Sequence, residues 1–432
     1  MKRLDRLYVG LLVIIFGGIV LHAPLSIIFG TIFPDLALIV KAWKELIMIL
    51  AAVLLLVILH RRQKYSLLKD PLLIAIALYA ALTLLLIPIF WQGIQAAVSG
   101  AMIDLRYLVF FVLVYVALKL YPSWRQIFMK VGLIGALIVT VFGVLQVTVL
   151  PNDALKHIGY SQSTIVPYLT VDENPDFVRI NSTLRGPNPV GAYSLIVLAV
   201  VAAYVLMGKL GRSQRTQILV GVLGASALVC LWVSYSRSAL AAAVVALLIV
   251  FVLTVGRRLS RNMWIAGSIV TLALAGGILG VLTATHNEFV SNVLLHENID
   301  GGSEVSSNEG HASSVDVAID EVITKPLGGG IGSTGSASLF GPDPLIIENQ
   351  YLFVAHEVGW FGLILFLLIN LGVLTRLWQL RRDWLAVGVF ASGVGLALIG
   401  LLLPVWVDDT VAIVWWGLAA IALTKPARGN RT

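Results

Sequence analysis

The sequence predicts an all-α, polytopic membrane protein with about twelve transmembrane helices. Of the 432 residues, 59% are hydrophobic and only 12% are charged, which is far more apolar than a soluble globular protein. The apolar runs also reach the length that crosses a hydrocarbon core of about 30 Å. We therefore expect one integral membrane domain over residues 1–432, embedded in the lipid bilayer.

The first predicted span is expected to remain in the chain. Its basic start and apolar centre resemble a signal peptide, but no small-residue cleavage site follows and many further spans do. The single cysteine, Cys230, lies inside an apolar run, which excludes an intrachain disulfide and a thiolate metal site. The predicted spans are 7–29, 37–60, 71–90, 104–120, 126–149, 188–207, 217–235, 238–256, 263–284, 350–373, 384–405 and 410–424.

Basic residues identify one side of the membrane. Twelve spans place both termini and every second loop on one side, and seven successive segments on that side carry Lys or Arg. Since cytoplasmic loops are rich in these residues, we expect both termini in the cytoplasm and the protein in the cytoplasmic, or inner, membrane. All carboxylates except Asp5, Asp70 and Asp383 then fall outside or at the outer boundary.

Two outer segments are long, 150–187 and 285–349. The inner loops are short and lack a nucleotide-binding motif, so any chemistry is expected to face outward, where no ATP or sugar nucleotide is available. Within the larger loop, apolar residues of "HASSVDVAIDEVITKP" recur every three or four positions, which predicts an amphipathic helix that ends at Pro326. Its apolar face would rest on the outer leaflet or cover the bundle, and the glycines of "PLGGGIGSTG" would allow a tight return.

Four arginines are expected near the outer boundary. Arg179 and Arg185 lie in "FVRINSTLRGPNPVG", Arg237 lies in the turn "SYSRSAL", and Arg106 lies in "MIDLRYLVFF". An ionised side chain costs about 3 kcal/mol at the centre of a membrane helix, so compensating partners are expected. At one depth the four would form an anion site, because the planar guanidinium binds phosphate in a bidentate manner. Alternatively, they anchor lipid headgroups at helix ends.

Glu348 and His311 are the candidate catalytic bases. An apolar wall raises the proton affinity of a carboxylate, which suits it to take a proton from a hydroxyl group. Asn349 and Gln350 follow Glu348 directly and are placed to hydrogen-bond a sugar. The alternative is structural: Glu348 and Asn349 would cap the following helix, and His311 would only begin the amphipathic helix.

Other polar residues are interpreted as structural. Lys41 and Glu45 form an i, i+4 pair at the outer interface. Asp408 and Asp409 begin the last helix, where capping is favoured over a metal pair. The histidines show no ligand spacing, so no metal site is predicted, and neither an organic cofactor nor a nucleic-acid partner is expected.

Four motifs in order resemble the O-antigen ligase and O-antigen polymerase superfamily. Its last large outer loop closes with a polar pair, nine residues, Gly, two residues and Gly, as in Glu348-Asn349 followed by Gly359 and Gly362. "ITKPLGGGIGS" resembles the family's Pro-Leu-Gly-x-Gly-x-Gly block. "SYSRSAL" resembles its Ser-Arg turn, and "STLRGPNPVGAY" resembles its Arg-Gly-x-x-Asn-Pro segment. The resemblance covers about residues 179–373.

The resemblance implies a GT-C-like glycosyltransferase that needs no metal. Such an enzyme takes a glycan from a polyprenyl-diphosphate donor on the outer face and transfers it to a hydroxyl of a glycan, lipid or other acceptor. Arg185 and Arg237 match the arginines that hold the diphosphate, and Arg179 is expected to assist them. In the family's ligases a histidine occupies the position of Glu348 and an arginine usually that of His311. The base therefore stays open between these two residues, and a polymerase-like reaction is favoured over transfer to lipid A.

Two other classes of function remain open. A transporter or flippase of lipid-linked glycans would suit twelve helices equally, but such proteins often carry ionisable groups near the bilayer midplane. The predicted helix interiors hold no Asp, Glu, Lys or Arg at mid-depth, and the two halves show no symmetry, which favours the transferase. In a non-catalytic scaffold, Glu348 and Arg237 would be only a cap and an anchor.

Overall fold

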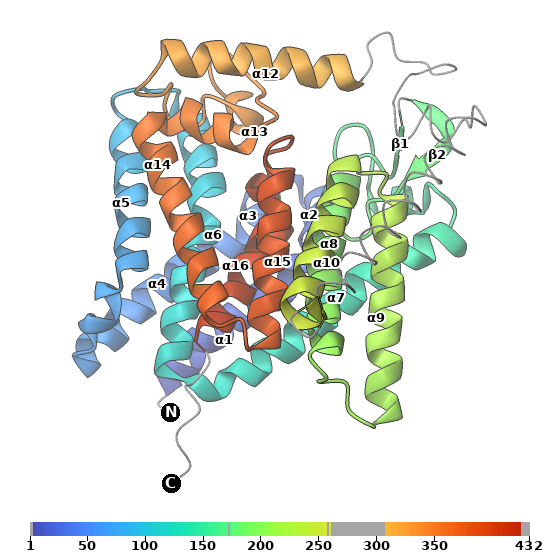
Figure 1. Ribbon diagram of the computed structural model, residues 1–432. Helices are drawn as coiled ribbons and strands as arrows, with labels where there is room; N and C mark the ends of the chain where they lie inside the picture. The colour runs from blue at the N-terminus through green and yellow to red at the C-terminus, as the bar shows by residue number, and fades with distance from the viewer. Residues whose placement is uncertain (1–2, 172, 257–258, 261–306, 425–432) are drawn as a thin grey trace.

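The computed structural model describes residues 3–171, 173–256, 259–260 and 307–424, and this part is almost entirely helical (Figure 1). The predicted span 263–284 and the first part of the loop 285–349 lie outside the described residues. The helices are α1 Arg3–Gly18, α2 His22–Ile32, α3 Ala37–Lys41, α4 Trp43–Arg62, α5 Pro71–Leu86, α6 Ile94–Leu120, α7 Arg125–Thr148, α8 Pro187–Leu206, α9 Gln214–Val233, α10 Arg237–Thr254, α12 Ser307–Thr324, α13 Gly335–Ser338, α14 Gln350–Gln379, α15 Trp384–Ile399 and α16 Asp409–Leu423.

Eight helical segments of the described chain are long and apolar enough to cross a membrane. The three shorter apolar helices α5, α15 and α16 pack among them. The eight are the continuous segment Arg3–Ile32, which contains α1 and α2, then α4, α6, Pro122–Thr148 with α7, α8, α9, α10 and α14. The class of fold is therefore confirmed, although the length criterion is met by fewer helices than the twelve spans predicted.

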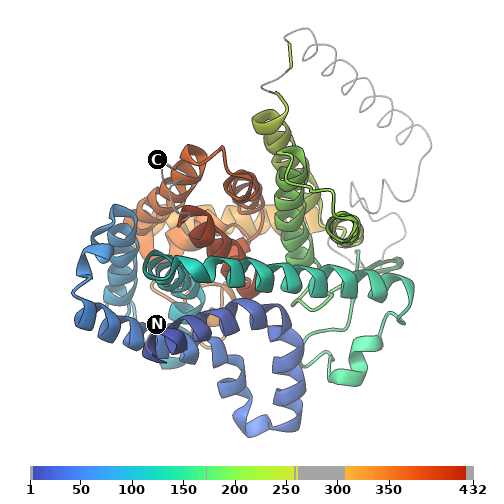
Figure 2. The ribbon, with the colours of Figure 1, turned by 90° about the horizontal axis from the view of Figure 1, so that it is seen from below.

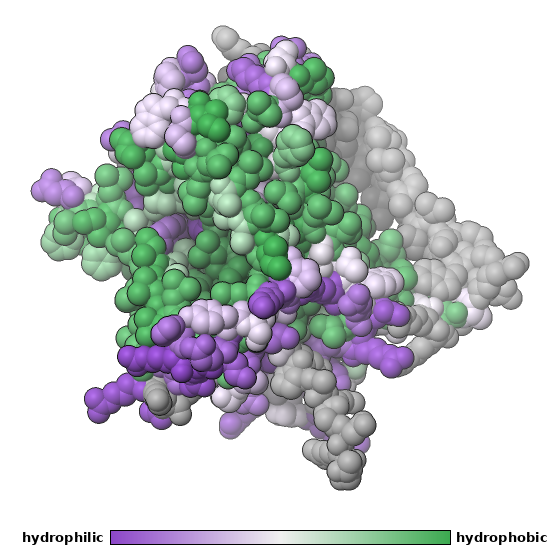
Figure 3. Space-filling view, turned by 90° about the vertical axis from the view of Figure 1, so that its left-hand side faces the viewer, coloured by the Kyte–Doolittle hydropathy of each residue, from purple (hydrophilic) through white to green (hydrophobic). Residues whose placement is uncertain are grey.

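The surface of the bundle carries a broad apolar belt bordered by polar edges (Figure 3). Large side chains such as Phe361 and Leu371 of α14 are more than half exposed there. Lipid is the solvent in which such a surface is stable. Inside, α8 packs against α9, α10 and α15, and α16 packs against α6. Figure 2 shows α7 between the blue α1–α2 segment and the green helices α8 and α9.

The start of α6 differs from the prediction. The helix begins at Ile94, ten residues before the predicted span 104–120. Residues 94–103, "IQAAVSGAMI", lie outside the predicted span because they are only moderately apolar. Most of them are nevertheless compatible with a helix. The small residues Ala96 and Gly100 pack against the glycine loop described below. Asp104 and Arg106 therefore lie near the middle of α6 and are buried, which corrects the placement of Arg106 at the start of its helix.

A short β-hairpin lies in the outer segment 150–187. Its strands are β1 Leu169–Val171 and β2 Asn174–Arg179, paired antiparallel with Thr170 opposite Val178. β2 ends at Arg179, six residues before the Arg-Gly-Pro-Asn-Pro motif begins, and this motif forms the start of α8. At the same end of the bundle, α12 lies across the tops of the other helices (Figure 1).

At the end of the bundle opposite α12, an ion pair connects α5, α6 and α14. Arg376 of α14 donates two hydrogen bonds to the Asp70 carboxylate, at 2.9 and 2.6 Å, and the Tyr115 hydroxyl of α6 donates a third at 2.8 Å. Asp70 also caps α5 by accepting from the Leu72 N–H. Burial alone would raise the pKa of Asp70, but these hydrogen bonds outweigh it and lower the pKa to about 2.

Candidate functional site

Helix α14 is broken at Gly359, and the glycine loop 326–332 fills the break. Gly359 has a left-handed backbone, with φ at 68°. In an unbroken helix the Trp360 N–H would donate to the His356 carbonyl. Here the Trp360 N–H donates to the Pro326 carbonyl at 3.0 Å, and the His356 carbonyl accepts from the Gly329 N–H at 2.6 Å. The exchange satisfies both backbone groups without water.

Several glycines of the loop are required by close contact and by backbone conformation. Gly328, Gly330 and Gly332 all have φ near +80 to +90°. A Cβ on Gly332 would lie 2.3 Å from the Ala96 carbonyl oxygen of α6, and one on Gly330 would lie 2.5 Å from Phe90. No side chain fits at these distances. The Pro-Leu-Gly-x-Gly-x-Gly pattern thus seats the outer loop between the start of α6 and the break in α14.

Two buried carboxyl groups lie beneath the loop. Glu357 accepts a hydrogen bond from the Gly332 N–H at 2.9 Å, and its side chain hydrogen-bonds to that of Asp104. Glu357 is 1% exposed and Asp104 is 8% exposed. Two carboxyl groups can hydrogen-bond only by sharing a proton, so the pair carries at most one negative charge. Sequence analysis missed this pair because its members lie in different helices.

The two arginine motifs meet at the start of α8. Arg179 donates from Nε to the Ser234 carbonyl at 2.8 Å and from a terminal nitrogen to the Asn188 side chain at 2.7 Å. A Cβ on Gly191 would lie 2.8 Å from Ala239, so α8 packs tightly against the Ser-Arg turn. Arg179 is therefore engaged in holding "RGPNPVG" against "SYSRSAL". Arg237, partly buried, is the first residue of α10 in this turn.

Each arginine motif contains a residue in a left-handed conformation. Ser182 has φ at 49° and Tyr235 has φ at 45°, and neither is glycine. The Ser182 backbone is held by the Gln146 side chain, and its hydroxyl donates to the Val139 carbonyl at 2.6 Å. Such conformations cost about 1–3 kcal/mol and cluster at functional sites. They support a functional rather than a purely structural role for the two turns.

The segment Gly400–Asp408, between α15 and α16, connects the remaining predicted residues. The Asn349 side chain caps α14 by accepting from the N–H groups of Tyr351 and Leu352, and it donates to the Leu401 carbonyl at 2.7 Å. The side-chain oxygen of Gln350, Oε1, accepts from the backbone N–H of Trp406 at 2.9 Å. Asn349 thus takes the capping role that the sequence left open. Glu348 precedes it and is partly buried.

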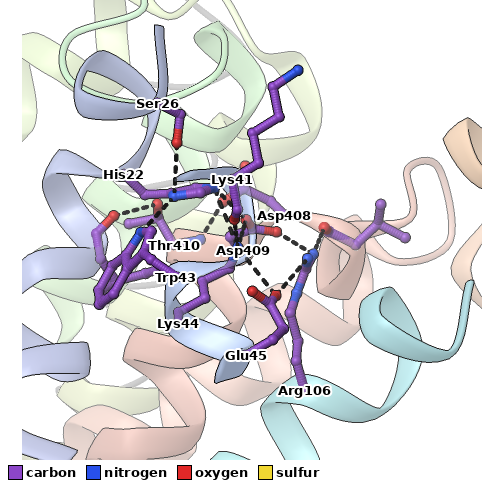
Figure 4. A network of polar contacts seen from close by, with 12 residues as sticks. His22, Ser26, Lys41, Trp43, Lys44, Glu45, Arg106, Asp408, Asp409 and Thr410 are labelled. Atoms are coloured by element: carbon purple, nitrogen blue, oxygen red, sulfur yellow. Dashed lines mark hydrogen bonds and ion pairs between the residues drawn. The ribbon is translucent and has the colours of Figure 1, made fainter. Parts of the chain in front are cut away.

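Arg106 joins a buried network of charged side chains at the start of α16 (Figure 4). It contacts the Asp409 carboxylate and the Val407 carbonyl, and it lies 3.9 Å from Glu45. Lys44 of α4 lies 2.9 Å from Asp409 and 3.1 Å from Glu45. Two cations and two anions balance one another, which offsets the cost of burying each charge.

The predicted pair of Lys41 with Glu45 is wrong. The helix is interrupted at Ala42, between α3 and α4, so the i, i+4 spacing no longer places the two side chains together. Glu45 pairs with Lys44 instead. Of the two aspartates, Asp408 caps α16 as expected, whereas Asp409 belongs to the network.

His22 closes the network, and its hydrogen bonds fix which nitrogen carries the proton. The Trp43 indole N–H can only donate, and it lies 3.0 Å from His22 Nδ1. Nδ1 is therefore the acceptor, and Nε2 donates to Asp409 at 2.9 Å. No part of this network except Arg106 was predicted as a functional site. The pattern of charges flanking three separate apolar runs was the available signal.

Arg185 differs from the other arginines that the structure describes at this end. It is exposed, and it forms no hydrogen bond or ion pair with another described residue. Its charge acts electrostatically on Asp408 and Asp409. Burial raises the pKa of Asp408. The negative charge of Asp409 raises this pKa further. The hydrogen bond from the Val411 N–H and the positive charges of Arg185 and Arg106 lower it in part.

The structure thus brings most of the predicted site residues to one end of the bundle. Arg185 neighbours Asp408, while Asn349 contacts the segment that leads to Asp408. Arg106 reaches the same segment at Val407. His311 lies in α12, but its side chain is outside the described residues. Within the described residues, no group of three or more His, Cys, Asp or Glu is arranged to hold a metal ion.

These features define a multi-pass membrane protein with a built polar site at one end of its bundle. Residues 220–367 match the family model Wzy_C, described as O-Antigen ligase. This match, over about a third of the chain, supports the resemblance to the O-antigen ligase and polymerase superfamily that the motifs predicted, and that family implies a glycosyl-transferring enzyme. The matched region contains the Ser-Arg turn, the glycine loop and Glu348, but not the Arg185 motif. No curated protein matches the chain.

Proposed function

We propose that the protein is a membrane glycosyltransferase that polymerises or ligates polyprenyl-diphosphate-linked glycans on the outer face of the cytoplasmic membrane. The observation that carries this proposal is Arg185. It lies in a motif that contains the left-handed Ser182, where this motif meets the Ser-Arg turn, and its guanidinium is exposed without a hydrogen-bonding partner among the described residues. The N–H donors of such an exposed guanidinium are available to bind a phosphate.

The proposed roles of the arginines differ. Arg185 holds the donor diphosphate, and Arg237 at the start of α10 is assigned to the same anion. Arg179 positions the two turns through its bonds to Ser234 and Asn188. Arg106, which is committed to Asp409, acts through that aspartate on the segment beside Arg185 rather than on the substrate.

The proposed reaction is a displacement at the anomeric carbon of the donor sugar. Glu348 or His311 takes the proton from the acceptor hydroxyl, whose oxygen forms the new glycosidic bond. The bond between the anomeric carbon and the diphosphate oxygen breaks, and its electron pair leaves with the diphosphate. Arg185 and Arg237 stabilise the charge that develops on this leaving group, which is the role a metal ion plays in other transferases.

The test is a reconstituted assay in liposomes with a polyprenyl-diphosphate oligosaccharide, with products sized by mass spectrometry. We expect Arg185→Ala to reduce transfer at least a hundredfold, and Arg185→Lys to restore part of it. Lys156→Ala is the matched control, since this exposed lysine pairs only with Asp153 in the same outer segment. Glu348→Gln and His311→Ala then distinguish the two bases.

The products distinguish the outcomes. Longer lipid-linked glycans would establish a polymerase, and transfer to a separate acceptor would establish a ligase. Intact donor that only changes leaflet would overturn the proposal in favour of a flippase.

A further inference from the structure

A narrow apolar cavity of about 320 Å³ lies away from the candidate site. Its wall is formed by α1, α7, α8, α9, α15 and α16, with Phe16, Ala136 and Val197 among the lining side chains. The wall has no acidic residue. Neither the proposed reaction nor the charged network uses this space. A void of this size would forfeit many packing contacts if nothing filled it.

The length of the cavity matches one leaflet of a bilayer. On α8 its lining extends from Tyr193 to Tyr204, which at 1.5 Å per residue is about 16 Å. Half of a hydrocarbon core is about 15 Å. Tyr204 lies in the last turn of α8, whereas Tyr193 lies in its second turn and is buried. The cavity therefore extends inward from the last turn of α8 for about the depth of one leaflet.

Several polar and aromatic lining residues come from helix ends at the side of the bundle where α1 begins, opposite the candidate site, and we take this side as the mouth of the cavity. Lys130 and Thr216 lie near the starts of α7 and α9, and the Tyr204 and Trp384 rings meet edge to face with centroids 4.9 Å apart. Tyr and Trp favour the membrane–water interface. Lys130, which lines the cavity, and Arg215, which precedes the lining residue Thr216 in the sequence, are exposed, and neither pairs with another described residue. Their charges make the mouth complementary to an anionic headgroup.

We propose that this cavity binds one acyl chain of an anionic phospholipid, whose phosphate is held by Lys130 and Arg215. The polyprenyl tail of the glycan donor is a poorer occupant. Its diphosphate would lie with Arg185, which precedes the first residue of α8, whereas the mouth of the cavity lies at the last turn of the same helix. The lipid therefore comes from the leaflet opposite the proposed reaction.

The experiment is native mass spectrometry of the full-length protein incubated with equimolar phosphatidylglycerol and phosphatidylcholine. We expect the wild-type protein to retain one phosphatidylglycerol in preference. Lys130→Gln should reduce this preference about fivefold, and Arg215→Gln by a similar factor. Lys64→Gln is the control, because Lys64 is an exposed lysine at the same end of the bundle but lies outside the cavity wall.

A second variant tests the cavity itself. Val220→Trp places an indole among the lining side chains and should abolish retention of both lipids. If it fails to fold, the charge variants still decide the question. Equal retention by wild type and Lys130→Gln, equal retention of the two phospholipids, or preferential retention of added polyprenyl phosphate would each overturn the proposal.

Discussion

The Glu357 carboxylate accepts a hydrogen bond from the backbone N–H of Gly332 at 2.9 Å. This contact joins α14, seven residues after its start, to the last glycine of the loop that leads into it. Asp104 of α6 hydrogen-bonds to the same side chain. One buried carboxyl group thus connects the glycine loop, α6 and α14.

Glu357→Gln should be tolerated, whereas Glu357→Ala should be destabilising. The amide of glutamine keeps an acceptor for Gly332 and a donor for Asp104, but alanine leaves both groups buried and unpaired, at a cost of about 1–3 kcal/mol each. Thermal unfolding in detergent measures the difference. Equal melting temperatures for the two variants would show that the hydrogen bonds contribute little.

Gly359→Ala should destabilise the protein and reduce transfer together. An alanine at φ 68° costs about 1–2 kcal/mol, and its Cβ would lie 2.7 Å from backbone atoms of Pro326 and Leu327. Gly221→Ala is the matched control, because Gly221 lies within α9 and a Cβ there meets no atom within 4 Å. We expect the control to be neutral or slightly stabilising. Similar melting temperatures for both variants would contradict the role assigned to the break.

Asp409→Ala should cost about 3–5 kcal/mol, because Arg106 and Lys44 would be left buried with only Glu45 as a counter-ion. The double variant Arg106→Met with Asp409→Leu should recover part of this loss, since it removes charges of opposite sign together. The free energies of unfolding of the two single variants and the double variant give the coupling energy. A coupling near zero would mean that the two side chains act independently.

The Asp70–Arg376 pair should make stability depend on pH below about 4. The pKa of Asp70 is lowered to about 2 in the folded protein, so its contribution is present above the ordinary value near 3.8 and is lost as pH falls through about 2. At neutral pH it amounts to about 2 kcal/mol. Asp70→Asn should therefore be less stable than wild type at pH 7, and the difference should shrink between pH 4 and pH 2. A difference that is constant with pH would exclude this pair as its cause.

The sequence was a good guide wherever a pattern is local. Apolar length predicted the membrane helices, the three- and four-residue spacing predicted α12, and Asp408 and Asn349 were recognisable as helix caps. The start of α6 was missed because residues 94–103 are only moderately apolar. The motifs indicated which segments matter, but they gave no sign that Arg179 holds two of them together.

The remaining errors concern contacts between distant segments. Asp104 pairs with Glu357 across more than 250 residues, and Lys44 pairs with Asp409 across more than 360. No periodicity within one helix reports such a partner. The role of Arg106 could not be predicted for the same reason. Its partner Asp409 is distant in the sequence, and the residues around Arg106 do not show whether it is exposed at a helix start or buried against an aspartate.

The broken turn of α14 fixes the permitted lengths of the outer loop. Three residues of the glycine loop each form one backbone hydrogen bond with that turn: Pro326 with Trp360, Gly329 with His356 and Gly330 with Glu357. Adding or deleting a single residue between Pro326 and Gly329 would put the Pro326 bond out of register with the two glycine bonds. The exposed stretch Pro342–Pro344 forms no such hydrogen bond and should accept insertions. Functional versions of this protein with longer or shorter loops should therefore differ in length at exposed stretches such as Pro342–Pro344, and not in the glycine loop.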